Sequence, residues 1–217
     1  DSFAAPMFAT NCWVLASEPG SECVVIDPGM PDVSAALEEI LQRHNLKPVA
    51  VIATHGHLDH TFSIQPIADG YDIPTYIHSE DRAYLSTPEK LLSAEFASTV
   101  SAMDFSEPTK VMELRNNDVI DLVGLSFRAI HAPGHTRGSL MFEVSEQVLV
   151  SGDVLFAGSI GRTDLPTGSA KEMEETLRKK VVPLSDHLEV LPGHGPRSSM
   201  AHEKKTNPYL KSLVGRY

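Results

Sequence analysis

The residues with the clearest capacity for chemistry lie between positions 55 and 60. Three histidines and a carboxylate follow the pattern His-x-His-x-Asp-His, at His55, His57, Asp59 and His60. The apolar run 48–54 indicates a strand, so the cluster begins where that strand ends. His55 and His57 are two positions apart and project to one side of extended backbone, whereas the other two residues follow at the turn into a helix. One short segment can therefore provide ligands for two neighbouring metal ions.

Three further candidate ligands, His135, Asp153 and His194, each stand at or just beyond the end of an expected strand. Each lies beside Gly or Pro, residues that allow sharp turns and close approach of backbone segments. Because the first cluster also begins at a strand end, we expect all of these side chains to converge on one site.

The seven candidates comprise five imidazoles and two carboxylates, which is enough for two metal ions. We expect one ion to be held by His55, His57 and His135. We expect the other to be held by Asp59, His60 and His194, with Asp153 as a bridge between the ions. Three protein nitrogens around an ion leave a position for water, which is typical of a catalytic metal. Because no cysteine takes part, the softness of the ligands does not select one metal. Two zinc ions per chain are expected, and iron or manganese are alternatives.

Short runs with strand character alternate with helical runs around these residues. Strands are expected at 12–17, 22–27, 49–54, 74–77, 110–113, 118–121, 124–131, 139–144, 147–151 and 188–191. Helices are expected at 32–43, 60–69, 79–85, 89–103, 170–181 and 199–206. Strands mixed with helices on this scale predict a layered α/β sandwich. We expect residues 1–217 to form a single domain.

The composition argues against several classes of partner. Among 217 residues, 29 Asp and Glu outnumber 18 Lys and Arg, and the formal charge is −11. Proteins that bind nucleic acids need a basic face, so nucleic acid is not an expected partner. No apolar run approaches the roughly 18–20 residues of a membrane span, and no membrane association is expected. Residues 1–10 lack the features of a secretion signal.

Two cysteines, Cys12 and Cys23, fall in an expected hairpin that turns at Pro19-Gly20. This turn would place Cys12 opposite Asp27, so the two thiols are too far apart for a disulfide. We therefore expect two buried thiols and a reducing, cytoplasmic compartment.

Taken together, these motifs resemble the metallo-β-lactamase superfamily, and within it the short, single-domain glyoxalase II-like hydrolases. The matching segments are 54–60, 131–136, 151–156, 161–164, 192–195 and 207–209. The resemblance implies an αββα sandwich of two mixed sheets flanked by helices, with metal ions at one edge between the sheets. It also implies the division of the seven ligands between two ions described above.

Among the activities of that superfamily, the resemblance favours hydrolysis of a small-molecule thioester such as S-lactoylglutathione. The commonest β-lactamases use a cysteine where this chain has Asp153 and lack a histidine at the position of His60. The implied mechanism is attack of a metal-bridging hydroxide on the thioester carbonyl, with Asp59 as ligand and orienting group and as a candidate proton shuttle. Two alternatives stay open: a mononuclear iron persulfide dioxygenase, which keeps the same ligands, and a non-catalytic metal-bearing scaffold.

Arg162 is the candidate contact for the anionic end of the substrate, because a guanidinium group suits a carboxylate. The alternative for this residue is a salt bridge to Asp164. The chain ends at Tyr217 without the helical domain that binds glutathione in two-domain glyoxalase II, and Gly195-Pro196 stand where that enzyme has a tyrosine. These departures count against glutathione as the thiol, and the alternatives are another low-molecular-weight thiol or a different ester. His131 is expected to have a supporting or structural role, and surface positions are expected for His44, His78, His187 and His202.

Overall fold

The computed structural model describes residues 1–31, 33–100, 103 and 105–213, which build two six-stranded sheets. The first sheet has the order β1 (Ser2–Ala4), β2 (Asn11–Leu15), β3 (Glu22–Ile26), β4 (Lys47–Ile52), β5 (Thr75–His78) and β6 (Val111–Leu114). The second sheet has the order β12 (Ser198–Ser199), β11 (Glu189–Pro192), β10 (Val148–Gly152), β9 (Leu140–Val144), β8 (Leu125–His131) and β7 (Val119–Leu122). Both sheets mix parallel and antiparallel pairs.

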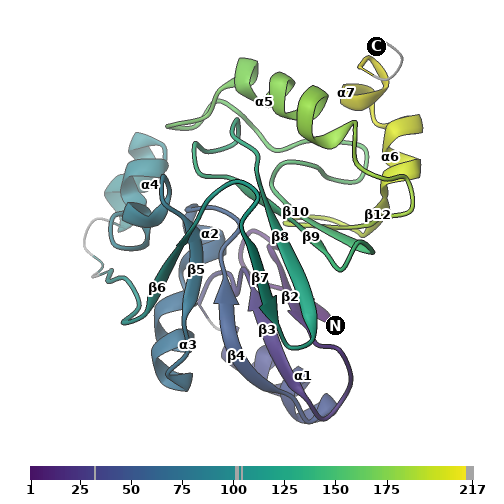
Figure 1. The fold of residues 1–217 in the computed structure, drawn as a ribbon. Helices are drawn as coiled ribbons and strands as arrows, with labels where there is room; N and C mark the ends of the chain where they lie inside the picture. Colours follow the sequence, from purple (N-terminus) through teal and green to yellow (C-terminus); the bar gives the residue numbers. More distant parts are fainter. Residues whose placement is uncertain (32, 101–102, 104, 214–217) are drawn as a thin grey trace.

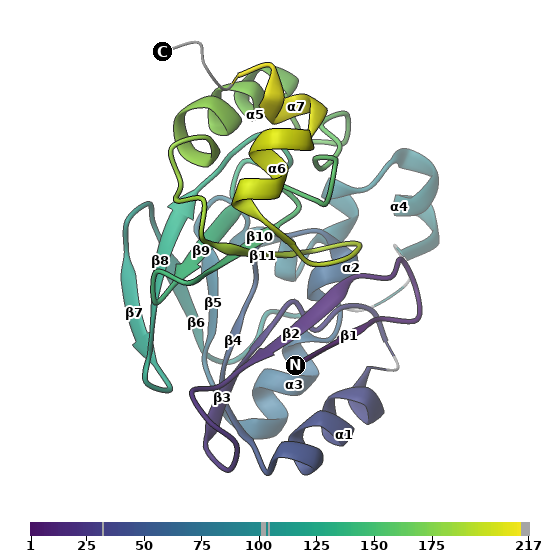
Figure 2. The ribbon, with the colours of Figure 1, turned by 90° about the vertical axis from the view of Figure 1, so that its right-hand side faces the viewer.

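Helices cover the outer faces of both sheets (Figures 1 and 2). The first sheet is flanked by α1 (Ser34–His44) and α3 (Ile64–Tyr71), and the second by α5 (Ala170–Thr176), α6 (Met200–Thr206) and α7 (Pro208–Lys211). Short helical segments complete the chain: α2 (Leu58–Thr61), η1 (Arg82–Leu85), η2 (Pro88–Leu91), α4 (Ala94–Val100) and η3 (Leu177–Val181). The expected αββα sandwich of two mixed sheets with flanking helices is confirmed.

Three apolar layers hold the sandwich together. Residues such as Trp13, Ile52 and Phe127 fill the space between the two sheets. A second cluster, with Leu37 of α1, packs the first pair of helices on their sheet, and a third, with Met173 of α5, does the same on the other side. Because most of these side chains are withdrawn from water, the apolar layers are the main source of the stability of the fold.

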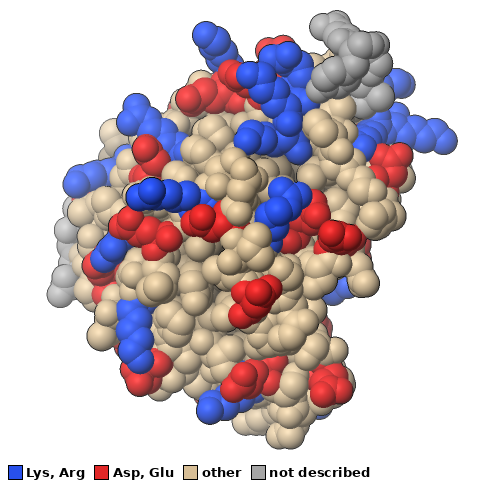
Figure 3. Space-filling view, viewed as in Figure 1, with Lys and Arg blue, Asp and Glu red and all other residues tan. Residues whose placement is uncertain are grey.

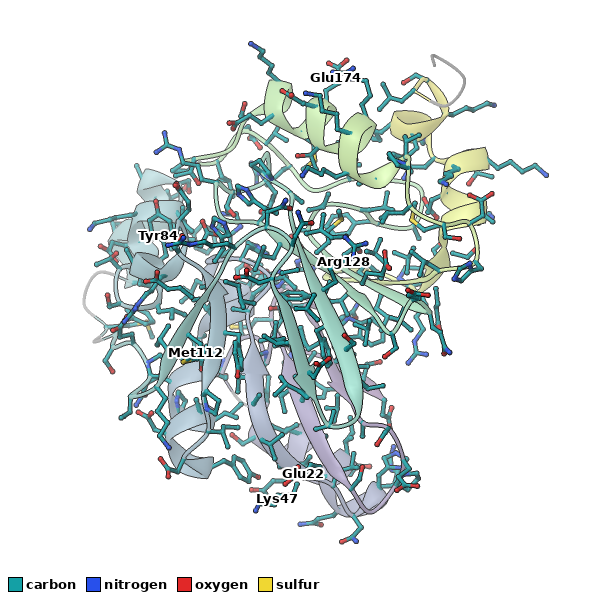
Figure 4. The ribbon with its side chains drawn as sticks, in the orientation of Figure 1. Glu22, Lys47, Tyr84, Met112, Arg128 and Glu174 are labelled. Atoms are coloured by element: carbon teal, nitrogen blue, oxygen red, sulfur yellow. The ribbon has the colours of Figure 1, made fainter. Side chains whose placement is uncertain are left out.

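The strands of the first sheet run so that several of them end at one edge. Glu22 and Lys47, the first residues of β3 and β4, pair in register and lie at the lower end of the sheet in Figure 4. The carboxyl ends of these two strands, at Ile26 and Ile52, therefore lie at the opposite edge. The segments that follow them carry the predicted ligand cluster.

The predicted strands all appear within two residues at each end, and the hairpin register is also confirmed. Trp13 lies opposite Ile26, which places Cys12 opposite Asp27, and both cysteines are buried free thiols. The short edge strands β1 and β12 and the terminal helix α7 were not expected.

Two of the predicted helices are each divided into two shorter ones. The run 60–69 divides into α2 and α3, because Ser63 donates its backbone N–H to the carbonyl of Gly29, and Pro66 has no N–H with which to continue a helix from α2. The run 89–103 divides into η2 and α4 at Leu92, whose backbone is extended, and residues 101–102 lie outside the described part.

The helix expected over 79–85 is reduced to the 3-10 turn η1, and the last turns of the one expected over 170–181 form a π-helix. None of the helices in the described ranges has the length and apolar character of a membrane-spanning segment.

Candidate metal centre

Three imidazole nitrogens form a small triangle at the edge between the two sheets. His55 Nε2 lies 3.0 Å from His57 Nδ1, which lies 2.8 Å from His135 Nε2, and the third side measures 3.2 Å. All three side chains are buried. Ligand atoms bonded to one tetrahedral zinc ion stand roughly 3.3 Å apart, given bonds of about 2.0 Å. The triangle therefore has the dimensions of three ligands around one metal ion.

A second group of ligand atoms adjoins the first. His194 Nε2 lies 3.3 Å from His60 Nε2 and 3.2 Å from Asp59 Oδ2. Asp153 stands between the two groups: its Oδ1 is 3.4 Å from His60 Nε2, and its Oδ2 is 3.5 Å from His135 Nε2. All seven candidate ligands therefore gather in one place, with a carboxylate in the position of a bridge.

The protons on two of the imidazoles point away from the centre. His135 Nδ1 lies 2.7 Å from the carbonyl oxygen of Arg162, and His194 Nδ1 lies 3.1 Å from that of Phe8. A carbonyl can only accept a hydrogen bond, so each Nδ1 must carry the hydrogen. With the hydrogen held on Nδ1, the Nε2 of each ring faces the centre and is the nitrogen whose lone pair can bind a metal ion.

Asp27 imposes the same orientation on two of the three other rings, directly on His60 and through Thr54 on His55. Its carboxylate accepts hydrogen bonds from His60 Nδ1 at 2.9 Å and from Thr54 Oγ1 at 2.6 Å. Thr54 Oγ1, having donated to the carboxylate, can accept from His55 Nδ1 at 3.1 Å. Sequence reasoning missed Asp27, although Ile26-Asp27-Pro28-Gly29 repeats the pattern of a carboxylate at a strand end beside Pro and Gly.

The donor set fits a pair of divalent cations. In the triangle, three nitrogens face one another, and one shared hydrogen can satisfy at most two of them. Asp153 Oδ1 is buried and has no hydrogen-bond partner among the described residues. Such an arrangement is costly unless a cation compensates the lone pairs and the charge. Five nitrogens and two carboxylates without a thiolate suit zinc, iron or manganese.

The sequence of residues 5–201 matches the family model described as the metallo-beta-lactamase superfamily. The chain belongs to this superfamily. The family implies that the clustered histidines and aspartates bind divalent metal.

Relatives of the chain cover nearly its whole length. An uncharacterised protein of Mycobacterium tuberculosis is 41% identical over 97% of each chain. The hydroxyacylglutathione hydrolase GloC of Haemophilus influenzae is 32% identical over 94% of each chain. Among solved structures, the BLEG-1 B3 metallo-beta-lactamase is 30% identical, with a TM-score of 0.82 over 97% of this chain and 98% of that one. TTHA1623, solved in a di-iron-bound form, is also 30% identical, with a TM-score of 0.79 over 97% of this chain and 100% of that one.

The protonation of this metallo-beta-lactamase superfamily site follows from burial and mutual charge. Burial, reinforced by His135, lowers the pKa of His57 to about 3. Burial also lowers the pKa of His60, but the carboxylates of Asp153, Asp59 and Asp27 outweigh it and raise that pKa above its ordinary value. Burial raises the pKa of Asp59, yet the charge of His60 and a hydrogen bond with His194 hold it below its ordinary value. Both carboxylates of the centre therefore stay ionised at neutral pH.

Asp81 is, like Asp27, a buried carboxylate outside the ligand set, and it joins the two loops that carry the histidine triangle. It accepts hydrogen bonds from the backbone N–H of Gly56, the backbone N–H of Gly138 and Thr136 Oγ1, at 2.8, 2.8 and 2.6 Å. Gly56 lies between His55 and His57, and Thr136 follows His135. Asp81 thus sets the distance between these loops, and no spacing in the sequence identified it.

The last turn of the site leaves no room for a side chain at Gly193. A Cβ atom there would lie 2.1 Å from Asp153 Oδ1 and 2.8 Å from His60 Cε1. Contacts this short do not occur, so the close approach of the backbone to the carboxylate requires glycine. The close approach that glycine was expected to allow at this position brings the backbone against the carboxylate of Asp153.

The remaining candidates have distinct surroundings. Arg162 lines the pocket over the metal centre, and its guanidinium also forms a two-pronged salt bridge with Asp164, at 2.8 and 2.7 Å. His131 lies outside that pocket and stacks on His78 with ring centroids 4.1 Å apart. The expectation that His78 is a surface residue is wrong, because this stack and its place at the end of β5 bury it.

Proposed function

We propose that the protein is a metal-dependent hydrolase that cleaves a small-molecule thioester at the seven-residue centre. The single observation that carries the proposal is the convergence of outward-protonated imidazoles and two ionised carboxylates on the floor of an open pocket. GloC, a hydroxyacylglutathione hydrolase, supports the choice of thioesters because it is 32% identical over nearly the full length of both chains.

When bound, a pair of divalent cations lowers the pKa of water towards about 7 and polarises a carbonyl oxygen. The protein supplies the orientation. Asp59 Oδ2 accepts a hydrogen bond from Thr10 Oγ1 at 2.9 Å, which leaves the other carboxylate oxygen to orient water or receive its proton. A carboxyl group is already ionised at neutral pH, so Asp59 is a poor proton donor there.

An ionised Asp59 suits a thioester better than an amide. In the proposed reaction the oxygen of water bonds to the acyl carbon, the carbon–sulfur bond breaks, and the sulfur leaves as a thiolate. A thiol with a pKa near 8.5 leaves without help from an acid and takes a proton from solvent afterwards. The products are a carboxylic acid and a free thiol, and no oxidant or reductant is needed.

Hydrolysis of a β-lactam is the second candidate, because the BLEG-1 B3 metallo-beta-lactamase is 30% identical over nearly the whole of both chains. The nitrogen of that ring is a worse leaving group than a thiolate and needs a proton as the bond breaks. The ionised state of Asp59 is therefore less favourable for this reaction.

The test is a side-by-side assay of protein loaded separately with zinc, iron or manganese. Three activities are measured on the same preparation: cleavage of S-lactoyl thioesters, hydrolysis of nitrocefin, and consumption of oxygen with a persulfide as substrate. Thioester cleavage that disappears with a chelator and returns with metal supports the proposal. Nitrocefin hydrolysis or oxygen uptake without thioester cleavage overturns it in favour of the corresponding alternative, and no turnover on any of them leaves a non-catalytic metal-binding role.

A further inference from the structure

The pocket above the metal centre has an apolar rim. It has a volume of about 560 Å³, and its floor is formed by candidate ligands that include His57, Asp153 and His194. The rim is formed by apolar side chains from three separate parts of the chain: Phe8, Leu92, Phe96, Phe156 and Leu165. Two of these rings, Phe8 and Phe96, are 52% and 48% exposed although they are large and apolar. Such exposure at the mouth of a binding pocket indicates a surface that a ligand covers.

Phe8 and Phe96 lie beside one another in the lining of this pocket. Their ring centroids are 6.1 Å apart and the rings are tilted by 58°. Phe8 lies in the connection between β1 and β2, and Phe96 lies on α4; Figure 2 shows that connection beside α4. Tilted rings at this separation attract one another and readily accept a third aromatic or branched apolar group.

The backbone of the connection that carries Phe8 is strained, and the strained conformation places the Phe8 ring at the pocket. Phe8 and the next residue, Ala9, both have positive φ values, 62° and 54°, in the left-handed region that side chains disfavour. The conformation is held because the carbonyl of Phe8 accepts from His194 Nδ1 and because Thr10 bonds to Asp59. The same connection therefore orients two candidate ligands and places an aromatic ring over the pocket, as expected where strain serves function.

The charges of the rim do not suit a substrate with several carboxylates. Arg162 is the one Lys or Arg among the described residues that line the pocket, and Asp164 already engages its guanidinium with two hydrogen bonds. Glu95 adds a negative charge to the same rim. The glutathione moiety carries two carboxylates and one ammonium group, and it would find no unpaired cation among these residues.

We propose that Phe8 and Phe96 form a clamp that selects thioesters with an aromatic or branched apolar acyl group, with little preference for a charged thiol. This inference rests on the proposed thioester hydrolysis and names its substrate class. The scissile carbonyl lies over the ligand floor, and the apolar acyl group packs against the surface that the two adjoining rings form together. The contribution of the clamp is to binding, so it acts mainly on KM.

The test uses two acyl groups on two thiols. Lactoyl and mandeloyl groups are both 2-hydroxyacyl groups and differ by a methyl against a phenyl; each is coupled to glutathione and to N-acetylcysteamine, which is uncharged. For the metal-loaded protein we expect kcat/KM to be about tenfold higher for the mandeloyl thioesters on either thiol, the usual discrimination of an apolar pocket. We expect glutathione to give no advantage over N-acetylcysteamine.

Phe8→Ala and Phe96→Ala should each reduce the mandeloyl preference to about twofold or less, through a higher KM for the mandeloyl thioesters. The Phe8→Ala variant keeps the backbone carbonyl that faces His194, and Phe96 lies on α4, which carries no candidate ligand. A loss of preference in both variants therefore points to the rings and not to a disturbed metal centre. Phe96→Leu should retain most of the preference. The matched control is Tyr71→Ala, which removes an exposed aromatic ring on α3, outside the pocket.

A wild-type preference for the lactoyl thioesters, or a mandeloyl preference unchanged in both alanine variants, would overturn the clamp and leave thioester hydrolysis standing. No turnover of any of the four thioesters by the metal-loaded protein would overturn the clamp and the proposed function together.

Discussion

The side chains of Asp27 and His60 are joined by a hydrogen bond of 2.9 Å between a carboxylate oxygen and Nδ1, and both are buried. Asp27 has a backbone φ of 48° at the end of β3, a conformation that turns its carboxylate into the space between β4 and α2. The same carboxylate accepts the backbone N–H of Thr54 at 2.8 Å. One acidic side chain, which is not itself a candidate ligand, thus fixes the orientation of a ligand ring and the end of a neighbouring strand.

Replacing Asp27 with Asn should weaken metal binding without removing a ligand. The amide keeps the size of the carboxylate, but it lacks the negative charge that strengthens the hydrogen bond from His60 Nδ1. If its NH2 group faces that N–H, two donors meet, and they cannot form a hydrogen bond with one another. Losses of about 10–100-fold in metal affinity are usual for such supporting contacts. Competition with a chromogenic zinc chelator measures the effect, and Asp121→Asn on the exposed edge strand β7 is the matched control. Equal affinities in the two variants would refute this role of Asp27.

Gly193→Ala should abolish binding of at least one metal ion. The added methyl group would lie 2.1 Å from Asp153 Oδ1, so the carboxylate or the backbone must move. Overpacking of this kind costs about 1–3 kcal/mol of stability. The comparison is Gly70→Ala in α3, where no atom lies within 4 Å of the added Cβ and helix propensity should add about 0.5–1 kcal/mol. Metal content of the purified variants, measured with their folding checked by circular dichroism, tests the prediction; full metal content in the Gly193 variant would contradict it.

Asp81→Asn should separate the two loops that carry the histidine triangle. If the amide nitrogen replaces Oδ2, the buried N–H of Gly56 faces another donor, at a cost of about 1–3 kcal/mol. We expect a lower melting temperature together with weaker metal binding, because Asp81 spaces the loop of His57 from that of His135. Thr136→Val removes one donor to the same carboxylate and should give a smaller effect in the same direction. A variant that melts lower but binds metal as tightly as the wild type would limit Asp81 to a role in stability.

The ligands could be predicted from the sequence because their signal is local. The spacing His-x-His-x-Asp-His lies within six positions, and each remaining ligand follows a strand whose apolar run is easily recognised. The register that places Cys12 opposite Asp27 was equally accessible, since a two-residue turn fixes the pairing of a hairpin.

The supporting contacts could not be predicted, because they join residues that are distant along the chain. Thr10 bonds to Asp59 across 49 positions, and Asp81 bonds to Thr136 across 55. No periodicity or motif links the two members of either pair. The division of the helix expected at 60–69 has the same origin, since a tertiary hydrogen bond from Ser63 to Gly29 competes with the helical pattern.

The charged surface explains why composition alone was a weak guide to the site. Figure 3 shows acidic and basic side chains interleaved on one face, over both the strands and α5. Among the side chains labelled in Figure 4, Arg128 is one of these surface residues, and it pairs with Glu143 on the neighbouring strand β9. Pairs of this kind stabilise a fold only slightly and carry no information about the chemistry at the sheet edge.

The buried histidine His78 predicts a specific dependence of stability on pH. Burial, reinforced by the charge of His131, lowers its pKa from 6.5 to about 4, and its Nδ1 accepts the backbone N–H of Glu80. Between these pH values the unfolded chain binds a proton that the folded chain does not, so the free energy of unfolding falls as the pH falls.

His78→Phe keeps a ring on His131 but cannot take up a proton. Its free energy of unfolding should fall less steeply from pH 6.5 to pH 4, by up to about 1 kcal/mol per pH unit. Urea unfolding at several pH values and equal metal content gives the two slopes, and His187→Phe at an exposed position is the control. Parallel slopes for the wild type and the His78 variant would show that His78 does not contribute this proton.

Binding of two divalent cations by the seven side chains can be measured by anomalous diffraction at the zinc edge from crystals grown with zinc. We expect two peaks. One should be bonded to His55 Nε2, His57 Nδ1 and His135 Nε2, and the other to Asp59, His60 and His194, with Asp153 reaching both. A single peak, or zinc bound away from these side chains while the triangle of nitrogens stays intact, would contradict the account.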